Sequence, residues 1–283
     1  MIAITGASGQ LGRFVIHNLL KEVEPSQLTA IVRNPEKVAD LQEVGVRIRK
    51  ADYSAADTWP AALAGVEKLL LISSSEVGYR AIQHANVIRA AQDVKLQLLA
   101  YTSILHADTS PLPLRQEHLQ TEKLLKQSGI PHVLLRNGWY TENYAASIPS
   151  ALEHGSLFGA AGHGKIASAA RADYASAAAK VLLSKNQAGK VYELAGDTAY
   201  TLEDFAAEIA LQTGKKIQYT DLGLEGYLNL LLQVGLPEPV ARLLAESDTG
   251  ASQGGLFDDS RQLSRLIGRP TTPFAETIRT HLQ

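Results

Sequence analysis

The sequence contains no cysteine and only one methionine among its 283 residues. The absence of cysteine excludes disulfides, zinc sites with thiolate ligands, iron–sulfur clusters and catalysis by a thiol. Any redox chemistry of this chain must therefore come from a bound cofactor.

The chain also lacks runs of like charge and long apolar segments. Its 27 Lys and Arg against 29 Asp and Glu give a net charge of −2, which does not indicate a nucleic-acid partner. Apolar runs such as Leu69–Ile72 are far too short to cross a bilayer. The first predicted strand begins at Ile2, which leaves no room for a signal peptide. We therefore expect a cytoplasmic protein without membrane or nucleic-acid partners.

What the sequence does contain is a regular alternation of apolar runs and helix-like segments. The predicted strands are Ile2–Thr5, Leu28–Val32, Val46–Arg49, Lys68–Ser73, Leu96–Thr102 and His132–Arg136, and the predicted helices include Gln10–Val23, Glu36–Glu43, Ala81–Gln92, Arg115–Gln127 and Tyr174–Leu183, the last with Asp173 as its N-cap. Strands that are apolar throughout are typical of a parallel sheet covered on both faces. The fold class is therefore α/β, a Rossmann-like doubly wound parallel sheet with a smaller C-terminal substrate lobe. We expect residues 1–138 to form the domain that contains this sheet, to which later segments return, and residues 139–283 to form mainly the smaller lobe.

The strongest motif is a glycine-rich loop directly after the first predicted strand. Gly6, Gly9 and Gly12 have the spacing Gly-x-x-Gly-x-x-Gly and precede a predicted helix. In such a loop the first glycine permits a tight turn, the second lets the backbone approach a diphosphate, and the third lets the helix pack closely on the strand. The helix start offers free N–H groups to the phosphates. The predicted cofactor-binding residues here are Gly6, Ala7, Ser8, Gly9, Gln10 and Leu11, although the same pattern also occurs in glycine turns without a ligand.

The end of the second predicted strand indicates which dinucleotide binds. Enzymes that use NAD place an acidic residue there, about 20 residues after the loop, for the ribose hydroxyl. This chain instead has Arg33, whose guanidinium can hold a 2′-phosphate. We therefore expect NADPH as the cofactor, with a solvated surface arginine as the alternative. Ser73, Ser74 and Ser75 end the fourth predicted strand and are expected to contact the same cofactor.

One catalytic residue that the fold class often uses is missing. Many short-chain dehydrogenases donate a proton to a carbonyl through a Tyr-x-x-x-Lys pair. Lys123 is present in the corresponding predicted helix, but Leu119 occupies the position of the tyrosine. This argues against reduction of ordinary ketones, whose product is a strongly basic alkoxide.

Several longer segments resemble the NmrA-like atypical short-chain dehydrogenases, and in particular their bacterial quinone-reductase branch. These segments include the loop Thr5–Gly12, Ile31–Pro35, Leu70–Gly78, Leu135–Tyr144 and Gly254–Ser260, and the resemblance covers essentially the whole chain. It implies direct hydride transfer from NADPH to a small-molecule quinone without flavin. The missing tyrosine is consistent with that reaction, because hydride addition to a quinone gives a weakly basic phenolate. A homo-oligomer is left open.

The residues after the sixth predicted strand are the candidates for the reacting end of the site. We expect Asn137, Gly138 and Trp139 to contact the cofactor, and Asn137, Tyr140 and Lys123 to be catalytic. The alternatives are a core position for Trp139, an interface position for Tyr140 and a surface position for Lys123. His106 and His118 are weaker candidates for proton supply, and no histidine spacing indicates a metal.

Two other functions are compatible with the same residues. One is reduction of another conjugated electrophile, such as a triphenylmethane or azo dye. The other is a redox sensor that binds NADP without turnover and regulates a protein partner.

Overall fold

The computed structural model describes residues 1–283, and the chain divides into two compact units. Unit 1 consists of Met1–Ala107, Gln116–Asn137 and Arg171–Tyr192. Unit 2 consists of Asp108–Arg115, Gly138–Ala170 and Glu193–Gln283.

Unit 1 is built around a seven-stranded sheet with the strand order β3-β2-β1-β4-β5-β6-β8. Its elements are β1 (Ile2–Ile4), α1 (Gln10–Leu19), β2 (Leu28–Val32), α2 (Ala39–Glu43), β3 (Arg47–Lys50), α3 (Trp59–Leu63), β4 (Lys68–Leu71), α4 (Arg80–Asp93), β5 (Leu98–Ile104), α5 (Arg115–Ser128), β6 (His132–Asn137) and α8 (Arg171–Leu183), with β8 (Val191–Leu194) at the edge of the sheet. All neighbouring strands from β3 to β6 are parallel. The predicted Rossmann-like fold is confirmed.

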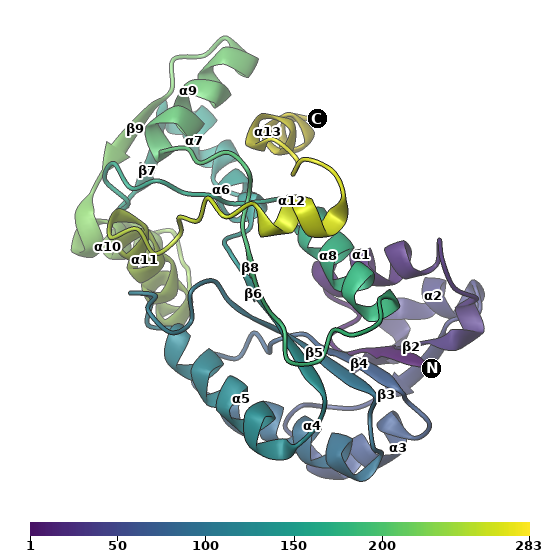
Figure 1. Ribbon diagram of the computed structural model, residues 1–283. Helices are drawn as coiled ribbons and strands as arrows, with labels where there is room; N and C mark the ends of the chain where they lie inside the picture. The colour runs from purple at the N-terminus through teal and green to yellow at the C-terminus, as the bar shows by residue number, and fades with distance from the viewer. The chain divides into compact units, whose positions relative to one another are not determined.

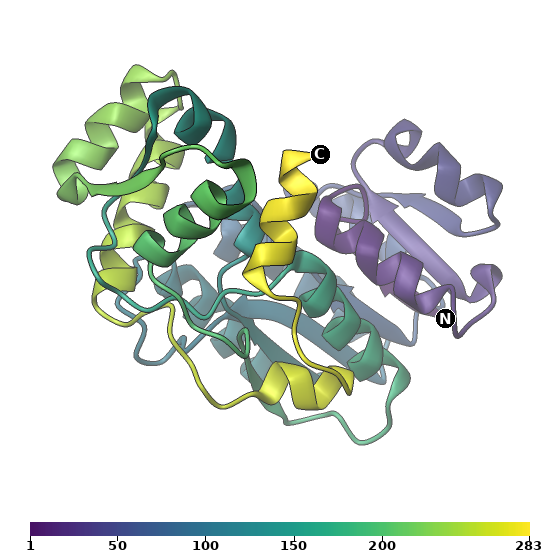
Figure 2. The same ribbon diagram turned by 90° about the horizontal axis from the view of Figure 1, so that it is seen from above.

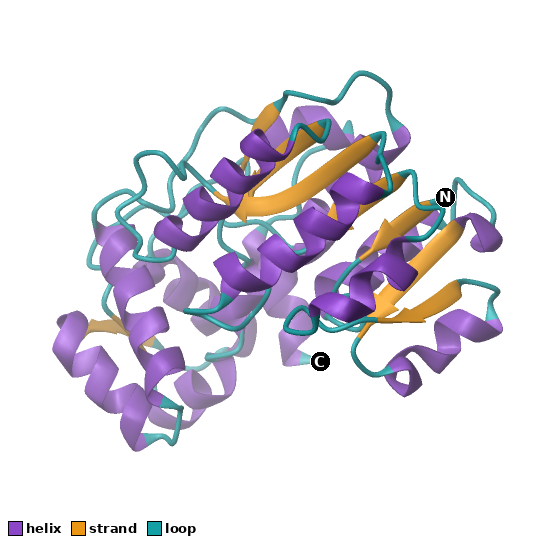
Figure 3. Cartoon of the chain, turned by 90° about the horizontal axis from the view of Figure 1, so that it is seen from below, coloured by secondary structure: helices purple, strands orange, loops and turns teal.

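Helices cover both faces of this sheet. Figure 1 shows α3, α4 and α5 along one face, and Figure 3 shows helices of the same layer in front of the strands. On the other face α1 and α8 pack side by side, as Figure 2 also shows. Every residue of β2 and β5 is buried, which explains why these strands are continuously apolar in the sequence.

The start of α8 differs from the sequence prediction. The helix begins at Arg171, three residues before the predicted start at Tyr174. Asp173 therefore lies within the first turn, where it is completely buried, and its prediction as the N-cap was wrong. Because an acidic residue interacts favourably with any position in the first turn of a helix, the sequence alone did not separate the two possibilities.

Unit 2 is mostly helical. It contains α6 (Thr141–Ala145), α7 (Ile148–His154), β7 (Ser156–Gly159), α9 (Leu202–Thr213), β9 (Gln218–Asp221), α10 (Gly223–Gln233), α11 (Glu238–Ser252), α12 (Gln262–Ile267) and α13 (Phe274–Leu282). The strands β7 and β9 form a two-stranded parallel sheet that the sequence did not predict. Part of the core is a cluster of Tyr200, Phe205 and Phe274, in which the rings of Tyr200 and Phe274 are 4.4 Å apart. None of the helices in the chain has the length and apolar character needed to cross a membrane.

The packing of α1 on β1 gives a first testable prediction. A Cβ at Gly12 would lie 2.6 Å from the carbonyl oxygen of Gly6 and 2.8 Å from the Cα of Ala7, and neither backbone atom can move independently. We expect Gly12→Ala to lower the free energy of unfolding by about 1–3 kcal/mol, the usual cost of overpacking. Urea denaturation measures this change.

Gly9→Ala is the matched control within the same loop. Its Cβ would meet only the Gly6 carbonyl oxygen, at 3.3 Å, and Gly9 has an ordinary negative φ. A smaller loss of stability is expected there. Equal urea midpoints for Gly12→Ala and the unaltered protein would show that the helix can move away from the strand.

Candidate functional site

The glycine-rich loop connects β1 to α1 in the way that an anion site requires. Gly6 has a φ of 58°, in the left-handed region that favours glycine, and its carbonyl accepts a hydrogen bond from the Gly9 N–H at 3.0 Å. Gly9 precedes α1, and no side chain caps the N–H groups of the first turn. These N–H groups have no partner within the helix and carry a partial positive charge, so they can bind a phosphate.

A cavity of about 260 Å³ opens beside this loop. It is lined by residues that follow four neighbouring strands: Gly6, Ser8 and Gly9 after β1, Arg33 after β2, Ala51–Tyr53 after β3 and Ile72–Glu76 after β4, together with Ile31, Val32 and Trp59. The carboxyl ends of parallel strands are where α/β folds bind ligands. Of the predicted cofactor residues, Gly6, Ser8, Gly9, Arg33 and Ser73–Ser75 line this cavity, whereas Ala7, Gln10 and Leu11 do not.

Arg33 meets an acidic residue that the sequence prediction missed. Its guanidinium donates to Oε1 of Glu76 at 3.0 Å, and its side chain is 65 % exposed. The other oxygen of Glu76 accepts a hydrogen bond from Gln83 of α4 at 2.6 Å. Glu76 is thus held on both sides, by Arg33 and by Gln83.

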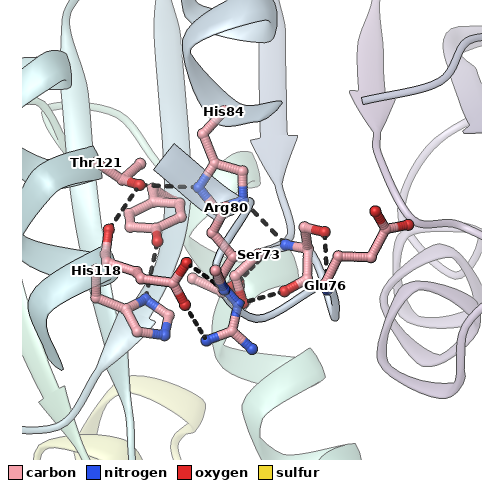
Figure 4. A network of polar contacts seen from close by, with 11 residues as sticks. Ser73, Glu76, Arg80, His84, His118 and Thr121 are labelled. Atoms are coloured by element: carbon pink, nitrogen blue, oxygen red, sulfur yellow. Dashed lines mark hydrogen bonds and ion pairs between the residues drawn. The ribbon is translucent and has the colours of Figure 1, made fainter. Parts of the chain in front are cut away.

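The segment Ser73–Gly78 has no regular secondary structure, but buried side chains hold its backbone (Figure 4). The Ser74 N–H donates to Nε2 of His84 at 2.9 Å, and Nε of Arg80 donates to the Ser74 carbonyl oxygen. The Ser73 N–H donates to Oγ1 of Thr102 at 2.8 Å, and the Gly78 N–H donates to Glu117. Side chains of α4, α5 and β5 therefore set the path of this segment along the cavity.

The contacts of His84 determine which ring nitrogen carries its proton. Because Nε2 accepts from the Ser74 N–H, the neutral ring has its proton on Nδ1, which donates to Oγ1 of Thr121 at 2.9 Å. The Thr121 hydroxyl in turn donates to the Glu117 carbonyl oxygen. Burial, together with the nearby charge of Arg80, lowers the pKa of His84 to about 3. His84 is therefore a neutral structural residue at physiological pH.

His118 lies in the same network but is a poor candidate for proton supply. Its Nδ1 is 2.8 Å from the hydroxyl of Tyr101, and both side chains are buried. Burial, and then the charges of Arg80 and His84, hold the pKa of His118 well below its usual range. At neutral pH the ring therefore carries no extra proton to donate.

At the end of β6, Asn137 has a buried oxygen without a partner. The side chain is 7 % exposed, and its Oδ1 makes no hydrogen bond within the protein. The preceding residue, Arg136, forms a buried ion pair with Glu122, whose Oε2 accepts from Nη2 at 2.7 Å and whose Oε1 accepts from Nε at 3.0 Å. The pair fixes the end of the strand beside Asn137. Lys123, by contrast, is exposed and lines neither of the cavities described here.

The other candidates after β6 belong to unit 2. The Gly138 N–H donates to the Leu194 carbonyl oxygen at 2.7 Å, and Tyr140 immediately precedes α6. Trp139 lines a second cavity, of about 450 Å³, together with Tyr144 and residues of α7, α10 and α11. The other lining residues belong to no motif in the sequence, and those of α10 and α11 lie far from Trp139 in the chain.

The residues of unit 1 fit a dinucleotide. The free helix start and the glycine loop suit a diphosphate, Arg33 suits a further phosphate, and the orphaned Asn137 oxygen needs a donor that a ligand would supply. No group of three or more His, Cys, Asp or Glu residues is arranged to hold a metal ion.

Comparisons with known proteins agree with this geometry. A family model described as NAD(P)H-binding matches residues 6–185. The chain is 59 % identical to quinone oxidoreductase 2 of Escherichia coli K12 over 282 residues, which are 100 % of this chain and 98 % of the relative. A crystal structure of an NADPH-dependent quinone oxidoreductase from Escherichia coli, complexed with NADPH, matches with a TM-score of 0.98 and 58 % identity over the whole of both chains.

A more distant solved structure has the same fold. The triphenylmethane reductase of a Citrobacter species, complexed with NADP(H), matches with a TM-score of 0.95 and 37 % identity over 99 % of this chain and 100 % of that chain. The resemblance that the sequence motifs indicated is thereby confirmed. From its nucleotide-binding geometry and these matches, the chain belongs to the NAD(P)H-binding family.

Proposed function

We propose that this protein is an NADPH-dependent quinone oxidoreductase that passes hydride directly to a quinone without flavin. The observation that carries the proposal is the 59 % identity, over the full length of the chain, to a quinone oxidoreductase. The cavity beside the glycine loop supports it, because that cavity has the parts that a phosphorylated dinucleotide needs. The proposal places the reaction in the cytoplasm, the compartment that the sequence led us to expect.

The residues of unit 1 bind and orient the cofactor. The N–H groups at the start of α1 hold the diphosphate, Arg33 holds the 2′-phosphate, and Ser73–Ser75 line the ribose side. Asn137 offers its buried oxygen to a donor on the ligand. When bound, NADPH supplies the hydride.

The residues of unit 2 bind the acceptor. Trp139 provides an aromatic wall, and Tyr140 is the hydrogen-bond donor to a quinone oxygen. This assignment makes unit 2 the substrate lobe. The role of Lys123 toward the ribose stays a prediction, and its exposure makes it the weakest of the three proposed catalytic residues.

The reaction needs little acid catalysis. Hydride addition to a quinone produces a hydroquinone monoanion, whose charge is delocalised and which takes its proton from solvent once it leaves the site. A product that needs no acid from the protein is consistent with Leu119 at the position of the usual tyrosine and with a neutral His118. Positioning of the two rings and exclusion of water are what the protein has to supply.

The decisive experiment is a steady-state assay of the purified protein, freed of flavin, with NADPH and simple benzoquinones and naphthoquinones. We expect quinone-dependent oxidation of NADPH, monitored at its absorbance maximum. Tight binding of NADP without turnover of any quinone would instead favour the redox sensor.

Replacement of Arg33 tests the assignment of the 2′-phosphate site. We expect Arg33→Ala to raise the KM for NADPH by about ten- to a hundredfold, the equivalent of one lost charge-assisted contact, and to change the KM for NADH little. Arg47→Ala is the matched control. Arg47 is the exposed first residue of β3, whereas Arg33 follows the last residue of β2, and Arg47 lines neither cavity. A parallel loss with both dinucleotides would place Arg33 outside the phosphate site.

Replacement of Glu76 tests whether it competes with the phosphate. Because its exposed ion pair with Arg33 has to open for the ligand, we expect Glu76→Gln to tighten NADPH binding by about two- to fivefold, as for a surface ion pair. Glu36→Gln is the control, since Glu36 is exposed near the same strand end without an ion pair to Arg33. Isothermal titration measures both. Weaker binding by Glu76→Gln would mean that Glu76 itself contacts the cofactor.

A further inference from the structure

Ser74 lies in the wall of the cavity beside the glycine-rich loop, and side chains behind that wall hold its peptide groups. The Ser74 N–H donates to Nε2 of His84 at 2.9 Å, and the Ser74 carbonyl oxygen accepts from Nε of Arg80. His84 belongs to α4, is completely buried and does not line the cavity. The position of this part of the wall therefore depends on a residue outside the lining.

The ring of His84 also packs against a second residue of the cavity wall, Tyr53. The two ring centroids are 5.9 Å apart, and the ring planes meet edge to face at 70°. The Tyr53 hydroxyl in turn lies 2.6 Å from Oγ1 of Thr5 and 2.6 Å from the Ile72 carbonyl oxygen. One imidazole thus supports the wall at two points, the Ser74 amide and the Tyr53 ring.

An imidazole can accept the Ser74 N–H only when its Nε2 carries no proton. In a neutral ring that condition places the proton on Nδ1, which then needs an acceptor of its own. Oγ1 of Thr121 in α5 lies 2.9 Å from Nδ1 and is that acceptor (Figure 4). The Thr121 hydroxyl proton points elsewhere, to the Glu117 carbonyl oxygen at 3.1 Å, so a lone pair of Oγ1 faces His84. Thr121 therefore selects the tautomer that holds Ser74.

Without the Thr121 hydroxyl, neither tautomer of His84 is satisfied. With the proton on Nδ1, a buried donor lacks an acceptor, and with the proton on Nε2, the ring and the Ser74 N–H face each other as two donors. Both His84 and Thr121 are completely buried, so the loss is not readily made good by solvent. Either choice weakens the hold of the ring on the Ser74 amide.

We propose that Thr121 is a positioning residue for the dinucleotide and acts through the ring of His84 on the Ser73–Ser75 wall of the cavity. The inference rests on the proposed function in taking NADPH as the ligand of this cavity. When only a fraction of the molecules has the wall in its binding conformation, the dissociation constant rises by the inverse of that fraction. In the bound complex the wall is back in place. Thr121 therefore affects the affinity for NADPH and not the rate at saturation.

The first test determines the tautomer of His84 in the unaltered protein. With isotopically labelled ring nitrogens, two-dimensional NMR distinguishes a nitrogen that carries a proton from one that does not, and sequence-specific assignment identifies the ring of His84. At pH 7 we expect a proton on Nδ1 and none on Nε2, because Nε2 accepts the Ser74 N–H. A proton on Nε2 would contradict the proposal, since the Ser74 amide would then have no acceptor in this ring.

The second test removes the Thr121 hydroxyl while keeping the shape of the side chain. We expect Thr121→Val to raise the dissociation constant of NADPH by about five- to tenfold in isothermal titration, the effect of one buried donor left unpaired. At saturating NADPH its kcat should stay within about twofold, because the bound complex has the same geometry. Thr121→Ser keeps the hydroxyl, so its dissociation constant should match that of the unaltered protein within about twofold.

Thr29→Val is the matched control for this substitution. Thr29 is equally buried, in β2, but its hydroxyl has no hydrogen-bond partner and it does not line the cavity. Its replacement should leave the dissociation constant of NADPH unchanged. Thermal unfolding checks that each variant folds. An unaltered dissociation constant for a folded Thr121→Val, or a loss of affinity equal in Thr121→Val and Thr121→Ser, would refute the proposal.

A double-mutant cycle tests whether Thr121 acts through His84. His84→Ala removes the acceptor of the Ser74 N–H, and we expect it to raise the dissociation constant of NADPH at least as much as Thr121→Val does. In the His84→Ala background Thr121→Val should then change that constant by less than about twofold, because the contact between the two side chains is already gone. The same fold-change in both backgrounds would mean that Thr121 acts by another route. If His84→Ala does not fold, the tautomer and the comparison of Thr121→Val with Thr121→Ser decide the question.

The outcomes separate this inference from the proposed function. Binding of NADPH that is equally tight in the unaltered protein and in Thr121→Val would reject the inference and leave the oxidoreductase proposal intact. Absence of NADPH binding by the unaltered protein would reject the proposed function, and the inference would fail with it because it takes its ligand from there.

Discussion

The glycine-rich loop of unit 1 leads into α1, and no side chain caps the backbone N–H groups at the start of that helix. Every helix begins with such groups, and most helices satisfy them locally. Helix α9 does so through a capping box, in which Thr201 and Asp204 bond to each other's backbone N–H groups. Helix α1 begins after Gly9, which has no side chain to offer. These donors therefore lie without a side-chain cap beside a cavity that the ends of the neighbouring strands line.

The second feature of that site is an irregular segment made rigid by buried side chains. The backbone of Ser73–Gly78 is satisfied by Arg80, His84, Thr102 and Glu117, which come from three different elements. These four hydrogen bonds favour one conformation of the segment, because an alternative would leave a buried donor or acceptor without a partner. The loop can therefore contact a ligand without first being ordered by it.

Local residue patterns predicted the strands of the sheet, the glycine loop and the position of Arg33 at a strand end, because each of these depends only on residues that are close together in the chain. They did not predict that Glu76 meets Arg33, since 43 residues separate the two and no pattern relates them. Asp248 and Tyr144 are 104 residues apart, and the cavity that they line is made by helices with ordinary amphipathic sequences. The role of Lys123 stays a prediction, because a family motif suggested it and the structure shows only that the side chain is exposed.

The neutrality of His84 has a consequence for how this protein responds to acid. Most histidines gain charge as the pH falls below neutral, and a hydrogen bond accepted by such a ring is then lost. The ring of His84 stays uncharged down to a pH of about 3, so the Ser74 amide keeps its acceptor throughout the physiological range. The path of the Ser73–Gly78 backbone is in this respect insensitive to acidification across that range.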